Sequence, residues 1–369
     1  MSISSNEIRA IAFYLPQYHP IKENDEWWGK GFTEWTNVGK ARPLFHGHYQ
    51  PKVPADLGYY DLRVAGVREE QARLAREAGI EGFCYWHYWF GNGKRLLDMP
   101  IRELLDTGRP DFPFCLGWAN HSWKLKTWDK DSKKDRLLVE QSYPGLHDIE
   151  THFSYVSKAF NDLRYIRVDG KPLFLIWRPG DIPECLDFVA TWKKLAEKSG
   201  LPGIYFVGFT YTASEIDSIV KAGFDSVVYD PSIEAARMSS LPKRLVRLAL
   251  RELFHYPVVI KYRKYARFVL DSIRIPNIIP CILPNFDHTP RSGSKGFVLQ
   301  SEPSLYEKLL QDVVAEVKQR PESARLLFIK SWNEWGEGNY LEPDLRYSHA
   351  YLDATRRVIK GGISVERMD

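Results

Sequence analysis

The sequence predicts a closed (β/α)8 barrel, because eight short apolar runs alternate with helical patterns along the 369 residues. An open, doubly wound sheet is the main alternative. That fold is disfavoured because no glycine-rich phosphate loop follows the first run, where residues 15–20 read LPQYHP. No linker rich in Pro, Gly or Ser divides the chain, so we predict a single barrel domain over residues 1–369.

The apolar runs are short and nearly without charge, which is typical of parallel strands that are buried on both faces. The predicted strands are residues 8–15, 79–87, 112–119, 172–177, 203–208, 226–229, 280–283 and 326–331. Apolar residues three and four positions apart predict helices over residues 62–78, 149–160, 185–198, 214–222 and 304–317. Gly79, Gly200 and Gly223 directly follow helical patterns, and we expect left-handed helix ends there.

Two segments depart from the regular alternation. Residues 20–60 join the first strand to its helix and are rich in Trp, Asn and Thr, so we expect a long loop over the end of the barrel. Residues 241–268 contain eight Lys or Arg and one Glu, and we predict a basic helical insertion after the sixth strand. A solvated basic face is the ordinary explanation. A surface that docks on anionic membrane lipid or on an acidic polysaccharide is the alternative.

Composition narrows the classes of function. The net charge of +4 is too small to indicate nucleic-acid binding. The 12 Trp residues lie mostly beside polar residues, which favours a sugar-binding site over a purely apolar core. We expect buried free thiols at the four widely spaced cysteines, Cys84, Cys115, Cys185 and Cys281. Without a secretory leader or a run of ~20 apolar residues, we expect a cytoplasmic protein, peripheral at the inner membrane if residues 241–268 dock there. The oligomeric state stays open.

The most informative segment is residues 328–344, which read FIKSWNEWGEGNYLEPD and begin within the eighth predicted strand. Cleaving a glycosidic bond needs one carboxyl that donates a proton and a second that acts as base or nucleophile. Glu334 and Glu337 are three apart, and close carboxylates raise one another's proton affinity, so one can stay protonated. We predict that they are the catalytic pair, and that Asn333 and Trp335 bind substrate.

Other kinds of active site fit the sequence less well. Five histidines could supply metal ligands, but none forms a closely spaced pair on a helix: His19, His46, His48, His87 and His121. We therefore expect no metal and no other cofactor. A serine or cysteine nucleophile with a histidine base has no local signature in this chain.

Six motifs occur in one order between about residue 8 and about residue 355: AFYLPQYHP, WWGKGFTEW, FCYWHYWF, GWANHSW, LIWRP and SWNEWGEGNYLEPD. Together they resemble the WbsX-like proteins of bacterial surface-polysaccharide loci, which are related to glycoside hydrolase family 99, the endo-α-mannosidases. The resemblance implies a (β/α)8 barrel of the TIM type that acts on α-linked sugars with retention at the anomeric carbon. Seven residues match motif positions at other strand ends, and we predict that they bind substrate: Tyr14, Trp86, His87, Trp118, Asn120, His121 and Arg178.

The resemblance also divides the work between the two acids. It implies that Glu334 takes the proton of the sugar 2-hydroxyl, which then attacks the anomeric carbon to give a 1,2-anhydro sugar. It implies that Glu337 protonates the departing oxygen and later deprotonates the incoming one. In the usual retaining route the second carboxylate itself bonds to the sugar.

Three functions follow from these observations. The first is a retaining, endo-acting glycoside hydrolase on α-linked manno- or rhamno-type bacterial glycans, with an oligo- or polysaccharide substrate and no nucleic-acid partner. The second is a glycosyltransferase of O-antigen or surface-polysaccharide biosynthesis, which the basic segment favours because lipid-linked acceptors lie on membranes. The barrel and the acid pair favour the first. A glycan-binding protein without catalysis is the weakest of the three.

Overall fold

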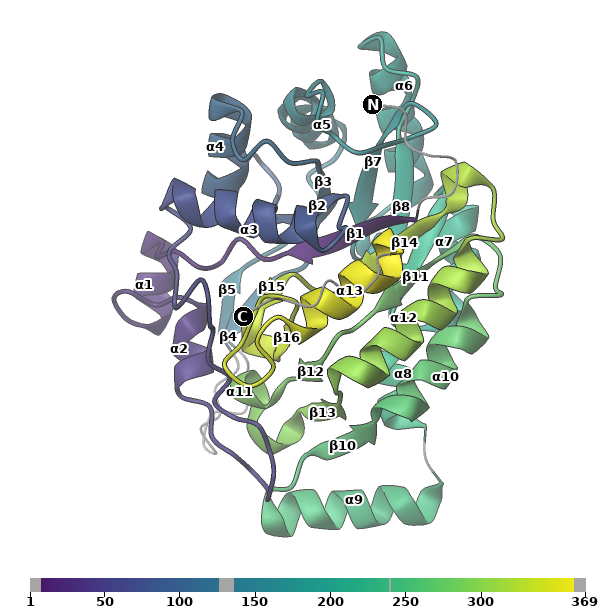
Figure 1. The fold of residues 1–369 in the computed structure, drawn as a ribbon. Coiled ribbons are helices and arrows are strands. Elements are labelled where there is room, and N and C mark those ends of the chain that lie inside the picture. The colour runs from purple at the N-terminus through teal and green to yellow at the C-terminus, as the bar shows by residue number, and fades with distance from the viewer. Residues whose placement is uncertain (1–7, 126–135, 239, 362–369) are drawn as a thin grey trace.

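The protein forms a closed barrel of eight parallel strands in the computed structural model, which describes residues 8–125, 136–238 and 240–361 (Figure 1). Each barrel strand pairs with the next in chain order, and the last pairs with the first, for example through Ile329 beside Ala12. The predicted barrel is therefore confirmed. Its strands are β1 (Arg9–Tyr14), β2 (Gly82–His87), β3 (Phe114–Trp118), β7 (Lys171–Ile176), β8 (Tyr205–Thr210), β9 (Ser226–Tyr229), β11 (Ile278–Ile282) and β14 (Leu326–Ile329).

A helix follows each barrel strand and packs on the outside of the barrel (Figure 1). The helices are α3 (Ala65–Glu77), α4 (Met99–Thr107), α5 (Leu146–Phe160), α6 (Cys185–Lys198), α7 (Ile216–Lys221), α10 (Tyr262–Ser272), α12 (Pro303–Val317) and α13 (Ala350–Lys360). The sequence patterns missed α4 and α13, which have only 9 and 11 residues and so show few repeats of the helical period. Gly79, Gly200 and Gly223 have the expected positive φ angles.

Aromatic rings fill the barrel interior near the carboxyl ends of the strands. Phe13 stacks on Trp86 with 4.8 Å between ring centroids and contacts Phe328 at 5.0 Å. Successive residues of a strand face opposite sides of the sheet. Tyr14 therefore faces outward, where its hydroxyl donates to Gln71 of α3 at 2.7 Å. This alternation decides which strand-end residues can reach the barrel axis.

The two irregular segments lie as predicted in the chain, with one correction. The long loop after β1 carries two short helices, α1 (Lys22–Trp28) and α2 (Glu34–Gly39). We predicted that the basic segment is helical, and only part of it is. It contains α9 (Leu241–Phe254), then a strand, then the first part of the barrel helix α10. The strand, β10 (Val258–Lys261), pairs with β13 (Phe297–Gln300), which lies far along the chain, and this pairing decides its conformation.

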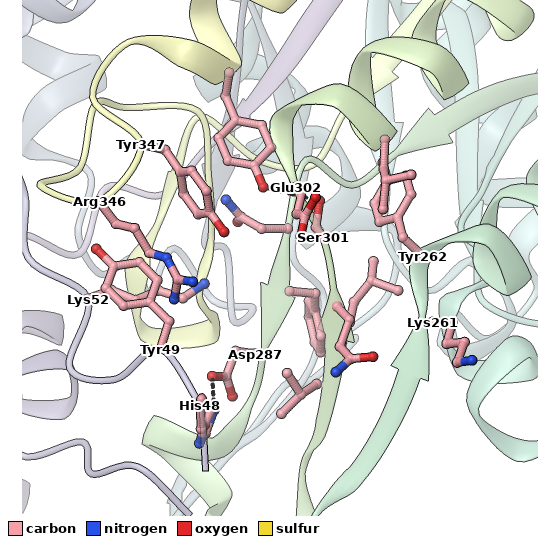
Figure 2. A pocket seen from close by; sticks show the side chains of 18 of the residues that line it. His48, Tyr49, Lys52, Lys261, Tyr262, Asp287, Ser301, Glu302, Arg346 and Tyr347 are labelled. Atoms are coloured by element: carbon pink, nitrogen blue, oxygen red, sulfur yellow. Dashed lines mark hydrogen bonds and ion pairs between the residues drawn. The ribbon is translucent and has the colours of Figure 1, made fainter. Parts of the chain in front are cut away.

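The strands β10 and β13 form a small sheet with β12 (Phe286–Asp287), and this sheet lines a cavity of about 410 Å³ together with residues 45–52 of the long loop (Figure 2). His48 and Gln50 both contact Asp287 Oδ2 at 2.7 Å. Burial alone would raise the pKa of Asp287, but the His48 hydrogen bond and nearby Lys52 lower it to about 2. An ionised Asp287 thus ties the long loop to the segment that follows β11.

The remaining elements are small, and most lie at the carboxyl ends of the barrel strands. They are β4 (Trp123–Leu125), β5 (Arg136–Val139), β6 (Arg167–Val168), α8 (Ser232–Arg237), α11 (Thr289–Ser292), β15 (Asn333–Glu334) and β16 (Asn339–Tyr340). The four cysteines are free thiols, and Cys84, Cys115 and Cys281 are buried as expected, whereas Cys185, the first residue of α6, is only half-buried. Across the described residues, every helix is too short or too polar to cross a bilayer. The prediction of one domain also covers residues 1–7 and 362–369, which lie outside the described residues.

Gly82, the first residue of β2, tests the close packing of the barrel wall. A Cβ atom built on Gly82 would overlap the carbonyl oxygen of Pro113 and lie 2.7 Å from its carbonyl carbon. Because this neighbour is backbone, it cannot rotate away. We expect Gly82→Ala to lower the free energy of unfolding by about 1–3 kcal/mol, measured by urea denaturation. The matched control is Gly66→Ala in α3, where nothing lies within 4 Å of the added atom. Equal stability of the two variants would contradict this account of β2.

Candidate active site

The two predicted catalytic glutamates lie directly beyond the end of β14. After Ile329 the chain passes through Lys330 and Ser331 to the β15–β16 hairpin, which contains Glu334 and Glu337. Asn333 fixes this hairpin to the end of β1, because its side chain accepts from Leu15 N at 2.7 Å and donates to Leu15 O at 3.1 Å. The side chains of Glu334 and Glu337 are only 10% and 17% exposed, so both carboxylates are largely removed from water.

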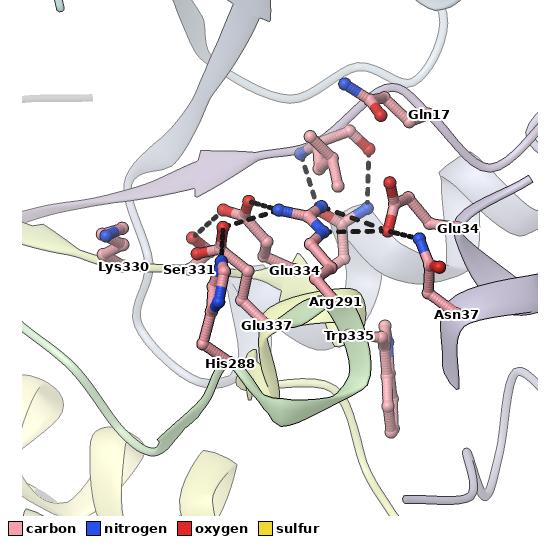
Figure 3. Close-up of polar contacts among 12 residues, drawn as sticks. Gln17, Glu34, Asn37, His288, Arg291, Lys330, Ser331, Glu334, Trp335 and Glu337 are labelled. Carbon is pink, nitrogen blue, oxygen red and sulfur yellow. Dashed lines mark hydrogen bonds and ion pairs between the residues drawn. The ribbon is translucent and has the colours of Figure 1, made fainter. Parts of the chain in front are cut away.

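One guanidinium holds three carboxylates together (Figure 3). Arg291 of α11 places NH1 2.6 Å from Glu337 Oε1 and 3.4 Å from Glu334 Oε1. Its NH2 lies 3.1 Å from Oε2 of Glu34, which begins α2 in the long loop. Burial alone would lower the pKa of Arg291, but the three carboxylates raise it well above its usual value. Segments far apart in the chain therefore meet at a permanently charged arginine.

The same contacts give the two catalytic candidates different proton affinities. Burial and repulsion by Glu337 raise the pKa of Glu334 to about 7. Burial also acts to raise the pKa of Glu337, but Arg291 and a hydrogen bond from His288 outweigh it and hold that pKa well below its usual value. Near neutral pH the pair thus holds at most one proton, and in the ligand-free site this proton favours Glu334.

A second cation, Lys330, lies near the acid pair. Lys330 Nζ lies 3.2 Å from Asp230 Oδ2 and donates to the Tyr211 hydroxyl at 2.9 Å. Burial acts to lower the pKa of Lys330, but Tyr211, Asp230 and the two catalytic candidates raise it well above its usual value. Ser331 Oγ lies 3.3 Å from Glu334 Oε2. Each of these groups interacts with the acid pair or with a partner of the pair.

Sequence reasoning missed several of these residues. Asp230 and Lys330 directly follow β9 and β14, so the rule that active-site groups lie at strand ends could have found them. Glu34 lies in the WWGKGFTEW motif, but its carboxylate has no signal of its own. Arg291 and His288 lie beyond β12, where no sequence pattern marks them.

A buried carboxylate supports the hairpin from behind. Glu342 accepts hydrogen bonds from Trp335 Nε1 at 2.6 Å, from Gln71 Nε2 at 2.6 Å and from the Tyr60 hydroxyl at 2.9 Å. Burial raises the pKa of Glu342 to about 7. Through Gln71 this network reaches Tyr14. Two of the predicted sugar-binding residues, Tyr14 and Trp335, thus have their polar atoms bonded within the protein.

Three more predicted sugar-binding residues also bond to protein groups. His87 Nε2 lies 2.9 Å from His152 Nε2 on α5. Trp118 Nε1 donates to the Trp89 carbonyl oxygen at 2.9 Å. Asn120 bridges to the backbone of Arg178, donating to its oxygen at 2.8 Å and accepting from its nitrogen at 2.8 Å. Together with Tyr14, Asn333 and Trp335, these side chains support the strand ends, and their direct contact with a sugar stays a prediction.

The remaining three predicted residues gather around Trp177. Trp86 lies 6.1 Å from the Trp177 ring, His121 meets it edge-on at 4.3 Å, and the Arg178 guanidinium lies 5.1 Å from its centroid. Burial lowers the pKa of His121 to about 4, so its ring is neutral near pH 7. An aromatic face with a neutral imidazole and a guanidinium suits the C–H faces and hydroxyls of a sugar. This cluster is the part of the predicted binding set that the structure brings together.

Comparisons with known proteins agree with this architecture. A sequence model of the family described as glycosyltransferase WbsX matches residues 10–355. The protein WxcX from two strains of Xanthomonas campestris pv. campestris is 39% identical over 355 residues, which make up 95% of this chain and 49% of WxcX. The chain therefore spans about half the length of these relatives.

Two solved structures share the fold. The family 99 endo-α-mannosidase from Bacteroides thetaiotaomicron has a TM-score of 0.58 and 17% identity over 98% of both chains. A protein described as glycoside hydrolase-like has a TM-score of 0.60 and 13% identity over 96% of this chain and 94% of its own. At such low identities the likeness establishes the barrel fold.

Replacing Arg291 by Met tests whether this arginine holds the carboxylates together. The variant leaves Glu34, Glu334 and Glu337 without their shared cation. Without the cation, burial and mutual repulsion raise the pKa of these carboxyls, and a carboxyl whose pKa is raised on folding destabilises the protein above its unfolded pKa, an effect that disappears as pH falls toward that value. We therefore expect Arg291→Met to lower the free energy of unfolding by on the order of 3 kcal/mol at pH 7.5. The loss should be smaller at pH 5, where the carboxyls can take up protons.

The matched control is Arg109→Met, which removes an exposed ion pair with Glu69. Such pairs contribute little, so its effect should stay within about 0.5 kcal/mol at both pH values. Denaturant titrations at the two pH values make the measurement. A loss for Arg291→Met that grows as the pH falls would contradict the assigned charges.

Proposed function

Because the chain belongs to the family described as glycosyltransferase WbsX and has the barrel of glycoside hydrolases, we propose that it is a carbohydrate-active enzyme. Its proposed reaction is the cleavage, with retention, of internal α-linked bonds in a manno- or rhamno-type bacterial glycan. Glu334 and Glu337 are the proposed catalytic pair. The observation that carries this proposal is that one arginine holds two carboxylates of unlike proton affinity at the end of β14.

Unlike proton affinities are what glycoside chemistry requires of such a pair. One group must give a proton to the departing oxygen while the other stays ionised. Positive charge grows at the anomeric carbon in the transition state, and ionised carboxylates beside it stabilise that charge. The cluster of Trp86, His121 and Arg178 around Trp177 is the proposed binding surface for a neighbouring sugar unit.

The proposed division of labour follows the resemblance. Glu334 removes the proton of the sugar 2-hydroxyl, whose oxygen attacks the anomeric carbon while the bond to the departing oxygen breaks. Glu337 protonates that oxygen. Water then opens the 1,2-anhydro sugar, giving its proton back to Glu337, while Glu334 returns a proton to O2. These roles need the proton on Glu337, whereas the ligand-free site favours it on Glu334.

We propose that substrate entry moves this proton. Arg291 keeps a second anchor on Glu34, at 3.1 and 3.2 Å, when a sugar hydroxyl replaces its contact with Glu337. Without the guanidinium beside it, buried Glu337 gains proton affinity and takes the proton from Glu334. Arg291 thus acts as a positioning residue that shields Glu337 until the substrate arrives.

The leaving group separates the roles of the two acids. If Glu337 is the proton donor, Glu337→Gln should slow cleavage of a natural α-linked oligosaccharide by about 10²–10⁴-fold. For an α-glycoside with a dinitrophenyl leaving group, the same variant should have a kcat/KM within about tenfold of the wild type, because that group departs without a proton and kcat/KM reports the steps up to its departure. Glu334→Gln should slow both substrates alike, since the 2-hydroxyl must lose its proton in either case.

The control for these assays is Glu322→Gln, at an exposed carboxylate remote from the pair, which should leave both rates unchanged. Steady-state rates on the two substrates make the comparison. Full activity in both Glu334→Gln and Glu337→Gln would refute the assignment of the catalytic pair. If Glu337→Gln slowed the two substrates equally, Glu337 would not be the proton donor.

The pH profile tests the shared proton. The reactive form carries one proton on the pair, whichever oxygen holds it, and the ligand-free pair loses this proton as pH rises through about 7. We therefore expect kcat/KM on the natural substrate to fall about tenfold per pH unit above that value. Rates measured from pH 5 to pH 9 on protein that stays folded throughout make the test. A kcat/KM that rises through pH 7 would contradict the shared-proton account.

A glycosyltransferase is the second candidate, favoured by the description of the family. Incubation with nucleotide sugars and an acceptor distinguishes the two. Release of nucleotide that requires the acceptor, without hydrolysis of any α-linked oligosaccharide, would replace the hydrolase by the transferase.

A further inference from the structure

Helix α9 lies along the edge of the molecule, outside the ring of barrel helices (Figure 1). Its large apolar side chains are between 37% and 73% exposed: Leu241, Leu245, Val246, Leu248, Leu250, Leu253 and Phe254. Met238, just before the helix, is 61% exposed. Single exposed leucines are ordinary, but a continuous apolar strip on one helix marks an interaction surface.

The strip occupies one side of α9. At about 100° per residue, Leu241, Leu245 and Leu248 lie along one margin of this broad face and Val246, Leu250 and Leu253 along the other, with Pro242 and Ala249 between them. One acidic residue, Glu252, lies between Leu241 and Leu245. Arg244, Arg247 and Arg251 lie on the other side, and Lys243 lies at the margin of the strip, between Leu250 and Phe254. Arg247 and Arg251 are half-buried, and Arg247 NH1 donates to the Ala236 carbonyl oxygen at 3.1 Å. The basic side therefore faces the body of the protein, and the apolar strip faces away from it.

Positive charge gathers behind the strip. Lys264 of α10 donates to the Ala235 carbonyl oxygen at 2.6 Å, beside the bond from Arg247 to Ala236. Burial lowers the pKa of Lys264, and the charges of Arg247 and Lys243 lower it further. Positive charges that repel one another in this way create a positive electrostatic potential, which a nearby anionic surface would neutralise.

We propose that α9 binds the surface of a bilayer that contains anionic lipid, with its apolar strip among the acyl chains and the exposed Lys243 and Arg244 at the phosphate groups. An apolar face one helix wide with basic residues along its margins is the pattern of interfacial helices. A second copy of the chain fits the strip less well, because each α9 carries four basic residues and one acidic residue, so two copies repel each other whereas an anionic surface attracts them. This proposal does not rest on the enzymatic function.

Vesicle co-sedimentation tests the proposal on the full chain. We expect binding to vesicles of phosphatidylglycerol and phosphatidylcholine, little binding to phosphatidylcholine alone, and weaker binding as salt increases. The double variant Leu245→Glu with Leu253→Glu should bind neither kind of vesicle. The double variant Lys243→Gln with Arg244→Gln should lower the partition coefficient for the anionic vesicles by roughly 30-fold, because each lost charge lowers it about fivefold.

The matched control is Leu163→Glu with Leu186→Glu, which places the same charges at exposed leucines elsewhere and should leave binding unchanged. Circular dichroism and the Tm show that each variant is folded. Light scattering behind a sizing column reports the oligomeric state. Binding that is equal with and without anionic lipid would overturn the proposal. The proposal would also be overturned if the chain formed an oligomer that dissociates in the variant Leu245→Glu with Leu253→Glu but stays intact when vesicles are added.

Discussion

The Arg291 guanidinium, shared by Glu34, Glu334 and Glu337, is the interaction on which the arrangement of the site depends. Three carboxylates gathered in a place largely removed from water repel one another, and without a cation they would take up protons or move apart. The barrel supplies only the β14 end of this arrangement. Glu34 comes from the long loop and Arg291 from the segment after β11. The Asp287 contacts with His48 and Gln50 hold those two segments against each other. The irregular segments are therefore as necessary to the site as the barrel.

The barrel could be predicted because each buried parallel strand is a short apolar run of its own, whose type does not depend on distant residues. Elements whose conformation depends on a distant partner could not be predicted in the same way. β10 carries basic residues on either side and becomes a strand by pairing with β13. The rule that functional groups follow barrel strands predicts Glu334 and Glu337 as site residues. It did not say which face each side chain takes. Tyr14 follows the inward-facing Phe13 and faces outward, and alternation along β1 could have indicated this. Arg291 follows no barrel strand and lies 43 residues before Glu334. Only the folded chain brings the two together.

The two proposed functions, glycoside hydrolase and glycosyltransferase, both act at the anomeric carbon of a sugar. In a hydrolase water accepts the glycosyl group, and in a transferase another hydroxyl accepts it, while the demands on the acid pair are alike. The proposed membrane contact of α9 would bring the enzyme to glycans carried on lipid, which suits either reaction. The pair, its arginine and the surface helix are therefore compatible parts of one proposal.

The most direct test of the central claim is the configuration of the product first released from an α-linked oligosaccharide, followed by proton NMR during the first turnovers. Two inversions, one by the 2-hydroxyl oxygen and one by water, would give an α-configured reducing end before mutarotation. A β-configured first product would contradict the proposed roles of Glu334 and Glu337.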